Sequence, residues 1–173
     1  MEPAAFLLFG NGDGTFQTPI TTSLNFSLPT VVVSADFNGD GNADIAIIGE
    51  SIAAVLLGNG QGGFENSSTF TDLDGVSGIA VGDVNGDGKP DLVISDVLQG
   101  ASLWMGNGNG TFNGSELLGG NASDVVVADF NHDGKLDVAT AFSDTGIVDV
   151  ALGNGDGTFQ PPLASPTGGG LNG

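Results

Sequence analysis

Residues 36–44 read Asp-Phe-Asn-Gly-Asp-Gly-Asn-Ala-Asp, and the same arrangement returns twice further along the chain. Residues 83–91 read Asp-Val-Asn-Gly-Asp-Gly-Lys-Pro-Asp, and residues 129–137 read Asp-Phe-Asn-His-Asp-Gly-Lys-Leu-Asp. These nine-residue segments, here named the Asp loops, begin 47 and 46 residues apart. An internal period of about 40–50 residues is typical of propeller blades, which contain four short strands each.

A second motif alternates with the Asp loops and has nearly the same period. It reads Gly-Asn-Gly-x-Gly-x-Phe, is here named the Asn-Gly turn, and occupies residues 10–16, 58–64, 106–112 and 153–159. Asn-Gly is a strong hairpin-turn signal. The fourth position changes between Asp13, Gln61, Asn109 and Asp156, so a carboxylate is not required there. We therefore interpret this motif as structural, with its Phe as a packing anchor.

Apolar runs of strand length recur at fixed places around both motifs. Each unit has a first strand before the Asp loop, a second after it, a third before the Asn-Gly turn and a more polar, variable fourth after the turn Phe. The sequence therefore predicts an all-β fold of β-propeller blades with four antiparallel strands, in a partial or open propeller of three complete blades plus a half blade. The predicted boundaries are 1–28 for the half blade (third and fourth strands), 29–75, 76–121 and 122–165 for the three blades, and 166–173 for a flexible Gly-rich tail.

The composition restricts the partners that the chain can have. Its 173 residues include 21 acidic and 2 basic side chains, for a formal net charge of −19. Such a surface repels nucleic-acid backbones and anionic membranes, so we expect neither as a partner, and it favours bound cations. No apolar run approaches the roughly 18–20 residues that span a bilayer, so membrane insertion is not expected. Cysteine is absent, and a secreted protein would carry its export signal outside this chain.

The Asp loops offer oxygen ligands at alternate positions. Ca²⁺ binds six to eight oxygens from carboxylates, amides and backbone carbonyls at about 2.3–2.6 Å. Positions 1, 3, 5 and 9 carry Asp or Asn, position 7 can turn its backbone carbonyl inward, and glycine at position 6 allows a sharp turn. We predict three Ca²⁺ sites with the ligands Asp36, Asn38, Asp40, Asn42 and Asp44; Asp83, Asn85, Asp87, Lys89 and Asp91; and Asp129, Asn131, Asp133, Lys135 and Asp137, where Asn42, Lys89 and Lys135 act through the backbone carbonyl.

Other interpretations of the Asp loops fit less well. A plain Asx turn needs no metal, but without a cation the clustered carboxylates would repel one another. Mg²⁺ demands stricter octahedral geometry. An EF-hand needs Glu at loop position 12, and this chain has Ile or Thr there. The single histidine, His132, stands where the other loops have glycine, so we expect an exposed turn residue. At position 2, the apolar side chains of Phe37, Val84 and Phe130 are expected to anchor the loops in the core.

At these residues the chain resembles the FG-GAP/VCBS repeat family, whose best-known members are the seven-bladed propellers of integrin α subunits. The Asp-x-Asn-x-Asp-Gly-x-x-Asp loop followed by an apolar strand carries the resemblance, which extends over nearly the whole chain. It implies a Ca²⁺ in the hairpin between the first and second strands, at the positions named above, and partners bound on the opposite face. Three and a half blades are too few for a seven-bladed ring, and the chain looks closer to bacterial secreted repeat proteins than to an integrin.

Two functional hypotheses follow from these features. The leading one is a calcium-binding structural and recognition module of an extracellular or cell-surface protein, used in adhesion or protein binding. The alternative is a carbohydrate-binding, lectin-like propeller or an accessory domain of a polysaccharide-degrading enzyme. Sugar sites favour exposed aromatics, and the obvious candidate, Trp104, occupies a third strand where packing between blades is expected.

An enzyme is not expected, because a nucleophile–histidine–acid triad could draw only on His132. An open array would also expose the apolar faces of its terminal blades, so either self-association through these open edges or marginal stability in isolation is expected.

Overall fold

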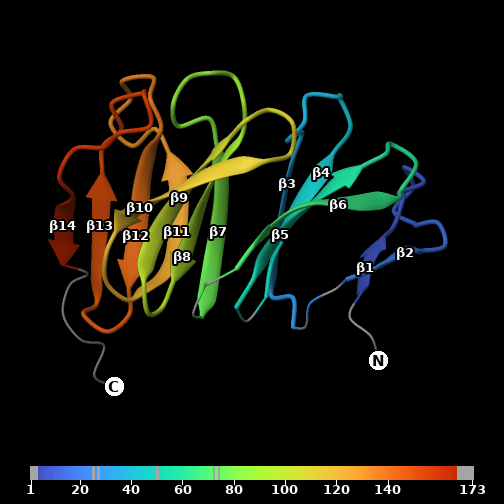
Figure 1. The fold of residues 1–173 in the computed structure, drawn as a ribbon, viewed down its shortest axis with the longest axis horizontal. Coiled ribbons are helices and arrows are strands. Elements are labelled where there is room, and N and C mark those ends of the chain that lie inside the picture. Colours follow the sequence, from blue (N-terminus) through green and yellow to red (C-terminus); the bar gives the residue numbers. More distant parts are fainter. Residues whose placement is uncertain are drawn as a thin grey trace.

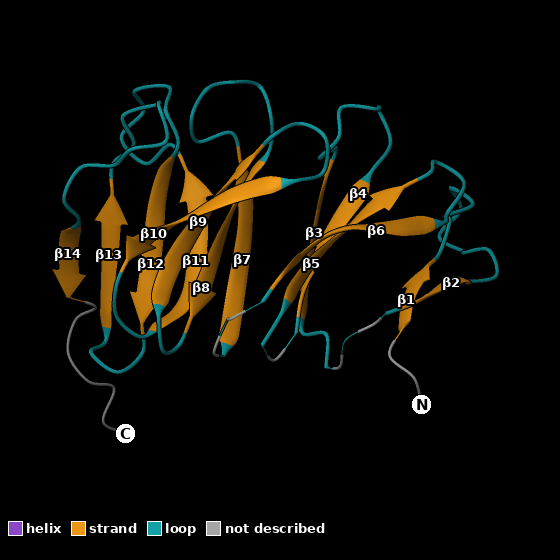
Figure 2. Cartoon of the chain, viewed as in Figure 1, coloured by secondary structure: helices purple, strands orange, loops and turns teal. Residues whose placement is uncertain are grey.

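The structure, a computed structural model, describes residues 4–166 except residues 25, 27, 50, 72 and 74, and it leaves aside the side chains of residues 66, 67, 115–118 and 164–166. The described residues form β-strands and turns and contain no helix (Figures 1 and 2). In this part of the chain there is accordingly no helix long and apolar enough to cross a membrane. The predicted all-β class is confirmed.

The strands form one two-stranded sheet and three four-stranded sheets. The half sheet pairs β1 (Ala4–Leu7) with β2 (Ile20–Ser23). Sheet 1 contains β3 (Val31–Ala35), β4 (Asp44–Ile48), β5 (Ala53–Gly58) and β6 (Phe64–Phe70). Sheet 2 contains β7 (Val76–Gly82), β8 (Asp91–Asp96), β9 (Gly100–Gly106) and β10 (Phe112–Leu118). Sheet 3 contains β11 (Ala122–Ala128), β12 (Asp137–Phe142), β13 (Ile147–Ala151) and β14 (Leu163–Pro166).

Each four-stranded sheet is an antiparallel meander whose strands follow chain order. The first strands lie together along one side of the array, because β7 contacts both β3 and β11. The sheets stand side by side in chain order, from the half sheet at one end to sheet 3 at the other (Figure 1). This propeller-like arrangement agrees with the predicted order of four strands per unit, while the predicted blade boundaries stay predictions.

The fourth strand of the last unit follows Phe159 as predicted, but it starts later than its counterparts. β14 begins at Leu163, whereas β6 and β10 begin at the turn Phe itself. Phe159 makes only an isolated bridge with Gly153, and Pro161 and Pro162, which follow it, have no N–H groups to donate to a strand ladder. Pro166, which the prediction placed in the tail, ends β14, and the rest of the predicted tail lies outside the described residues.

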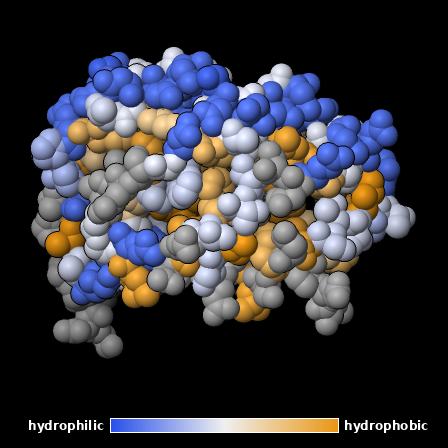
Figure 3. All heavy atoms as spheres, in the orientation of Figure 1, coloured by the Kyte–Doolittle hydropathy of each residue, from blue (hydrophilic) through white to orange (hydrophobic). Residues whose placement is uncertain are grey.

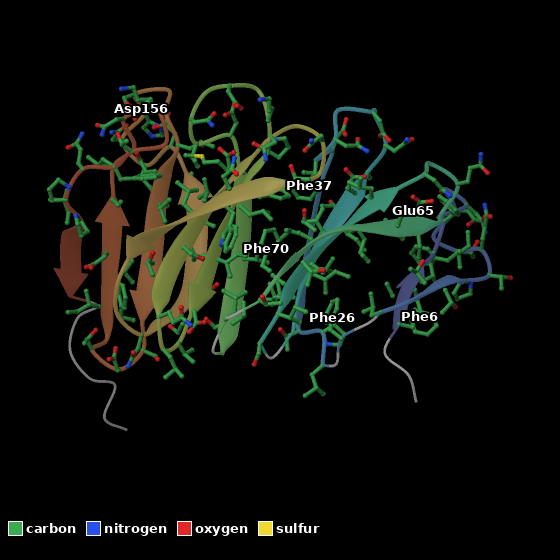
Figure 4. The ribbon with its side chains drawn as sticks, viewed as in Figure 1. Phe6, Phe26, Phe37, Glu65, Phe70 and Asp156 are labelled. Atoms are coloured by element: carbon green, nitrogen blue, oxygen red, sulfur yellow. The ribbon has the colours of Figure 1, made fainter. Side chains whose placement is uncertain are left out.

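The core lies between neighbouring sheets rather than within one of them. Between sheets 1 and 2, Phe37 packs edge-on against Phe112, and Phe70 packs edge-on against Trp104, with ring centroids 5.6 and 4.5 Å apart. Figure 4 shows Phe37 and Phe70 pointing into this space. The Trp104 indole N–H donates to the hydroxyl of Ser102, so the single polar group of the Trp104 side chain has a hydrogen-bond partner. The predicted role of Trp104 in packing between units is therefore confirmed.

The two ends of the array are open. Val32, Ile79 and Val125 occupy the same place in the three sheets, yet their side chains are 59%, 7% and 4% exposed. The half sheet that precedes sheet 1 has only two described strands, β1 and β2, and neither of them covers β3, so Val32 is exposed. At loop position 2 the exposure is reversed: Phe37 and Val84 are each 1% exposed, while Phe130 is 46% exposed.

The expectation that Phe130 anchors its loop in the core is therefore wrong. Phe37 is covered by sheet 2 and Val84 packs with residues of sheet 3, but no described sheet follows sheet 3. Phe16 departs in the same way from the expected role of the turn Phe: it is mostly exposed, because the described residues place no sheet before the half sheet. Exposed apolar surface of this kind favours association.

We expect the isolated chain to self-associate through the open face of sheet 3. Phe130→Ser should lower the apparent mass at high protein concentration, because it removes the largest exposed apolar side chain of that face. Leu98→Ser is the control, since Leu98 is even more exposed than Phe130 but lies in the turn between β8 and β9. Light scattering after size exclusion measures the mass. A wild-type chain that stays monomeric at every concentration contradicts the expectation.

Candidate metal sites in the Asp loops

The three Asp loops join the first and second strands of sheets 1, 2 and 3. The Asn-Gly turns join the third and fourth strands and lie at the same end of the sheets, at the top of Figure 1. Hydrophilic residues form a nearly continuous band along this end of the molecule (Figure 3). All fifteen predicted ligand residues therefore lie at one end, in three separate loops.

The carboxylate at position 1 accepts hydrogen bonds from the backbone of its own loop. In the first loop, Asp36 accepts from the N–H groups of Gly39, Asp40 and Gly41, over 2.8, 3.1 and 2.8 Å. The other two loops repeat the last two of these bonds, with Asp83 and Asp129 as acceptors. One negatively charged side chain thus organises the turn of each loop around itself.

Positions 3 and 5 continue this pattern. Asn38 Oδ1 accepts from the Asp40 N–H over 2.9 Å, and Asp40 Oδ1 accepts from the Asn42 N–H over 2.7 Å. Both bonds recur in the second and third loops. The backbone N–H at position 7 lowers the pKa of Asp40 and of Asp87, so both exposed carboxyls are ionised at neutral pH.

Glycine at position 6 has the backbone conformation that the sequence predicts. Gly41, Gly88 and Gly134 have φ of 83°, 82° and 85°, in the left-handed region that side chains disfavour. His132 at position 4 adopts a φ of 62° and is exposed, so its predicted role as a turn residue is confirmed.

Position 9 has a role that the sequence interpretation missed. Asp44 is fully buried, and its two oxygens accept from the N–H groups of Phe37 and Gly58, each over 2.7 Å. Asp91 and Asp137 make the equivalent pairs of bonds in the other units. Because the second donor is the first glycine of the Asn-Gly turn, this carboxylate ties the two repeated motifs together.

The glycine at that junction is required by packing. A Cβ on Gly58, Gly106 or Gly153 would collide with the backbone carbonyl at position 8 of the Asp loop. The signal was present in the sequence: every Asp at position 9 is followed 14 to 16 residues later by this glycine, as in the pairs Asp44–Gly58 and Asp137–Gly153. The two motifs form one structural unit.

The Asn-Gly turns hold their shape with internal hydrogen bonds. Asp13 accepts from the N–H and the hydroxyl of Thr15, and Asp156 does the same with Thr158. These bonds lower the pKa of both carboxyls. Asn109 makes the same pair of bonds with Thr111 without any charge. The polar residue of this turn therefore serves the turn itself, as the sequence interpretation holds.

The donor atoms of the Asp loops fit a hard cation such as Ca²⁺. Burial raises the pKa of Asp91, and the charges of Asp87 and Asp83 raise it further, so the three carboxylates of this loop repel one another. A carboxylate has about four acceptor sites, so its backbone hydrogen bonds leave lone pairs for an ion. Among the described residues, no three Asp, Glu, His or Cys side chains are grouped so that they alone could hold a metal ion, so each ion would also need Asn and backbone oxygens.

A plain Asx turn would use the same hydrogen bonds without an ion. The two interpretations therefore differ in what calcium adds to the stability of the loop and not in the shape of the loop.

The chain is similar to one protein family in sequence and to a solved structure in fold. A sequence profile described as FG-GAP-like repeat matches residues 36–94 and 83–140. Curated proteins give no significant match. Among solved structures, an Agrocybe aegerita lectin that recognises non-reducing terminal N-acetylglucosamine is similar over 94% of this chain, with 25% identity and a TM-score of 0.65. The chain spans 46% of the length of that lectin.

Proposed function

Because the chain belongs to the FG-GAP-like repeat family, we propose that it is a non-catalytic recognition module, built of propeller blades, in which each Asp loop holds one Ca²⁺ ion. The observation that carries this proposal is the threefold repetition of one loop. Each copy places Asp, Asn, Asp and Asp at positions 1, 3, 5 and 9, in the same hydrogen-bonded shape. The turns could form without so many acids, and on a chain of net charge −19 clustered carboxylates destabilise the folded state by repulsion unless cations bind to them.

The ions would have an architectural role. In the first unit, Asp36, Asn38, Asp40 and Asp44 and the carbonyl of Asn42 would hold the ion, and the equivalent residues would do so in the others. Each Ca²⁺ supplies two positive charges, so three ions reduce the net charge from −19 to about −13. Since Asp44 also bonds to the Asn-Gly turn, an ion beside it would stiffen both motifs at this end.

Calcium titration tests the proposal by its stoichiometry. We expect three ions per chain by isothermal titration calorimetry, with dissociation constants of roughly 10⁻⁴–10⁻³ M, as in extracellular calcium modules. The triple variant Asp40→Ala, Asp87→Ala and Asp133→Ala should bind none. The variant Asp13→Ala with Asp156→Ala is the matched control, because it removes two exposed acids from the Asn-Gly turns, and it should still bind three. Equal loss of binding in both variants would indicate diffuse attraction to the acidic surface.

The partner of the module is proposed to be a protein or a glycan. The likeness to a sugar-binding lectin favours the glycan and keeps the carbohydrate-binding alternative as a second candidate. We place the module outside the cell or at the cell surface, because the millimolar calcium there would fill sites of this affinity. A non-catalytic function is supported by the position of His132, the single histidine of the chain. It lies on an exposed turn inside an Asp loop, where it is poorly placed to serve as the base of a catalytic triad.

A further inference from the structure

The half sheet contains only the outer two strands of a unit. β1 and β2 are joined by the Asn-Gly turn of residues 10–16, as β5 and β6 are joined by that of residues 58–64, so they correspond to a third and a fourth strand. In the other sheets a second strand pairs with the third, but among the described residues β1 pairs with β2 alone (Figure 1). The free edge of β1 is therefore a template on which another strand can pair.

Gly10, the first glycine of this turn, has neither of the contacts that its counterparts make. In the complete units, the N–H of this glycine donates to the buried Asp at loop position 9, and a Cβ on it would collide with the carbonyl of position 8. The bridge between Gly10 and Phe16 uses the N–H groups of Asn11 and Gln17, and among the described residues no group accepts from the Gly10 N–H. Apart from its chain neighbours, the atom nearest to a Cβ on Gly10 would be 4.0 Å away, in the Phe16 ring. Gly10 is thus open at the point where an Asp loop meets each of its counterparts.

The apolar residue at loop position 2 also has an empty counterpart. Phe37 and Val84 fill the space between neighbouring sheets, each in a cluster with a third-strand residue of its own sheet and with a second-strand residue and the turn Phe of the next sheet. These partners are Val55, Leu92 and Phe112 for the first cluster, and Leu103, Val138 and Phe159 for the second. The equivalent residues between the half sheet and sheet 1 line a cavity of about 450 Å³, here named the loop hollow; they are Leu7, Ile45 and Phe64. The loop hollow therefore has the walls of a loop-anchor site and lacks the side chain.

A second cavity of about 370 Å³, here named the strand hollow, lies between β1 and the strands β3 and β4 of sheet 1. Its wall is mainly apolar and includes Leu7, Val32 and Ile47. Val32 is 59% exposed, whereas its counterparts in β7 and β11 are buried, because these two strands lie against the first and second strands of the preceding sheet. The surface left open beside β1 is therefore the surface that a first and a second strand cover in the rest of the molecule.

We propose that the free edge of β1 and the two hollows together bind a β-hairpin formed by the first and second strands of an FG-GAP-like unit in a partner chain. The repeat defines this hairpin by its chemistry: two apolar strands, a bulky apolar residue at loop position 2 for the loop hollow, and an Asp at position 9 that accepts from Gly10. Its first strand continues the row formed by β3, β7 and β11. A second copy of this chain is not the occupant, because each of its described Asp-loop hairpins is already paired with the third strand of its own sheet. The proposal goes beyond the proposed function, since it assigns a second surface and does not require calcium.

Backbone amide NMR of the full chain tests the proposal with a synthetic peptide of residues 76–96, which contains β7, the second Asp loop and β8. The peptide is cyclised between its paired ends, Val76 and Asp96, so that the hairpin is formed before it binds. With a Kd on the order of 0.1 mM, it should shift the amides of Leu7, Gly10 and Val32, and the Gly10 amide most, since it gains a carboxylate acceptor. No shift at about 1 mM peptide, or equal shifts with a cyclic peptide of the same composition in scrambled order, would overturn the proposal.

Substitutions in the chain separate docking from folding. Gly10→Ala should leave the melting temperature of the free chain nearly unchanged, because the added methyl group meets open space. It should weaken peptide binding about tenfold or more, since the methyl group would collide with the position 8 carbonyl of the docked loop. Val32→Asp, which places a charge in the strand hollow, should also weaken binding. Thr21→Ala, at an exposed position of β2 outside both hollows, is the control and should bind as the wild type does. Unaltered binding by both Gly10→Ala and Val32→Asp would contradict the proposed site.

A change in the peptide tests the predicted contact with Gly10. The peptide carrying Asp91→Ala should bind about tenfold more weakly, because the Gly10 N–H then stays without an acceptor. If the Gly10 amide of the chain alone shifts with protein concentration, the occupant is a second copy and the proposal is overturned. The peptide titration should give the same shifts in EDTA and in calcium. Calcium binding is followed separately by the amides of Gly41 and Gly134 in the Asp loops, so either proposal can fail without the other.

Discussion

Removing calcium is expected to lower the melting temperature of this chain by roughly 10–30 °C. A ligand present at 10 to 100 times its dissociation constant stabilises the folded state by about 1.4–2.7 kcal/mol per site, so three sites contribute roughly 4–8 kcal/mol at 10 mM calcium. For a domain of this size, about 1 kcal/mol shifts the melting temperature by roughly 2–4 °C. Thermal melts followed by circular dichroism, in excess EDTA and in calcium, measure the difference.

The calcium-dependent rise in melting temperature supports calcium binding in the Asp loops only if it depends on the acids of these loops. The triple variant Asp40→Ala, Asp87→Ala and Asp133→Ala should melt at nearly the same temperature with and without calcium. Magnesium at the same concentration should stabilise the wild type less, because Mg²⁺ demands stricter geometry and keeps its water. If the wild-type melt is the same in EDTA and in calcium, the loops are plain Asx turns.

Replacing the buried carboxylate at position 9 is expected to have the second largest effect. Asp91→Ala leaves the N–H groups of Val84 and Gly106 buried without their acceptor, and it separates the Asp loop from the Asn-Gly turn. Two unsatisfied buried donors cost about 2–6 kcal/mol together. Unlike calcium removal, this loss should appear in EDTA. Urea unfolding in EDTA measures the free energy of unfolding.

Asp87→Ala in the same loop is the matched control. Asp87 is exposed, and its ion pair with Lys89, 3.2 Å long, lies at the surface. Surface pairs contribute little, so this variant should leave stability in EDTA nearly unchanged and lose about a third of the calcium-dependent gain. The opposite pattern, in which Asp87→Ala unfolds the chain without calcium and Asp91→Ala does not, would contradict the division of roles between the two positions.

The fold could be predicted from the sequence because its signals are local and repeated. Apolar runs at fixed distances from the Asp loops indicate the order of the strands. Because the same pattern occurs in three units, each unit supports the assignment of strands in the other two. Glycine at position 6 has the predicted positive φ, and Trp104 packs between sheets as expected. The delayed start of β14 at Leu163 was not foreseen, since the effect of Pro161 and Pro162 on pairing was not considered.

What the sequence could not provide depends on contacts between distant segments. Phe130 has the same local sequence as Phe37, and only the presence or absence of a following sheet decides which is buried. The tie between Asp44 and Gly58 spans two motifs that were interpreted separately.

Anomalous diffraction from crystals grown in millimolar calcium tests the central claim most directly. The account predicts three anomalous peaks, one in each Asp loop, about 2.3–2.6 Å from the side-chain oxygens of positions 1, 3, 5 and 9 and from the backbone carbonyl of position 7. Three intact sheets whose Asp loops contain no metal under these conditions would contradict it.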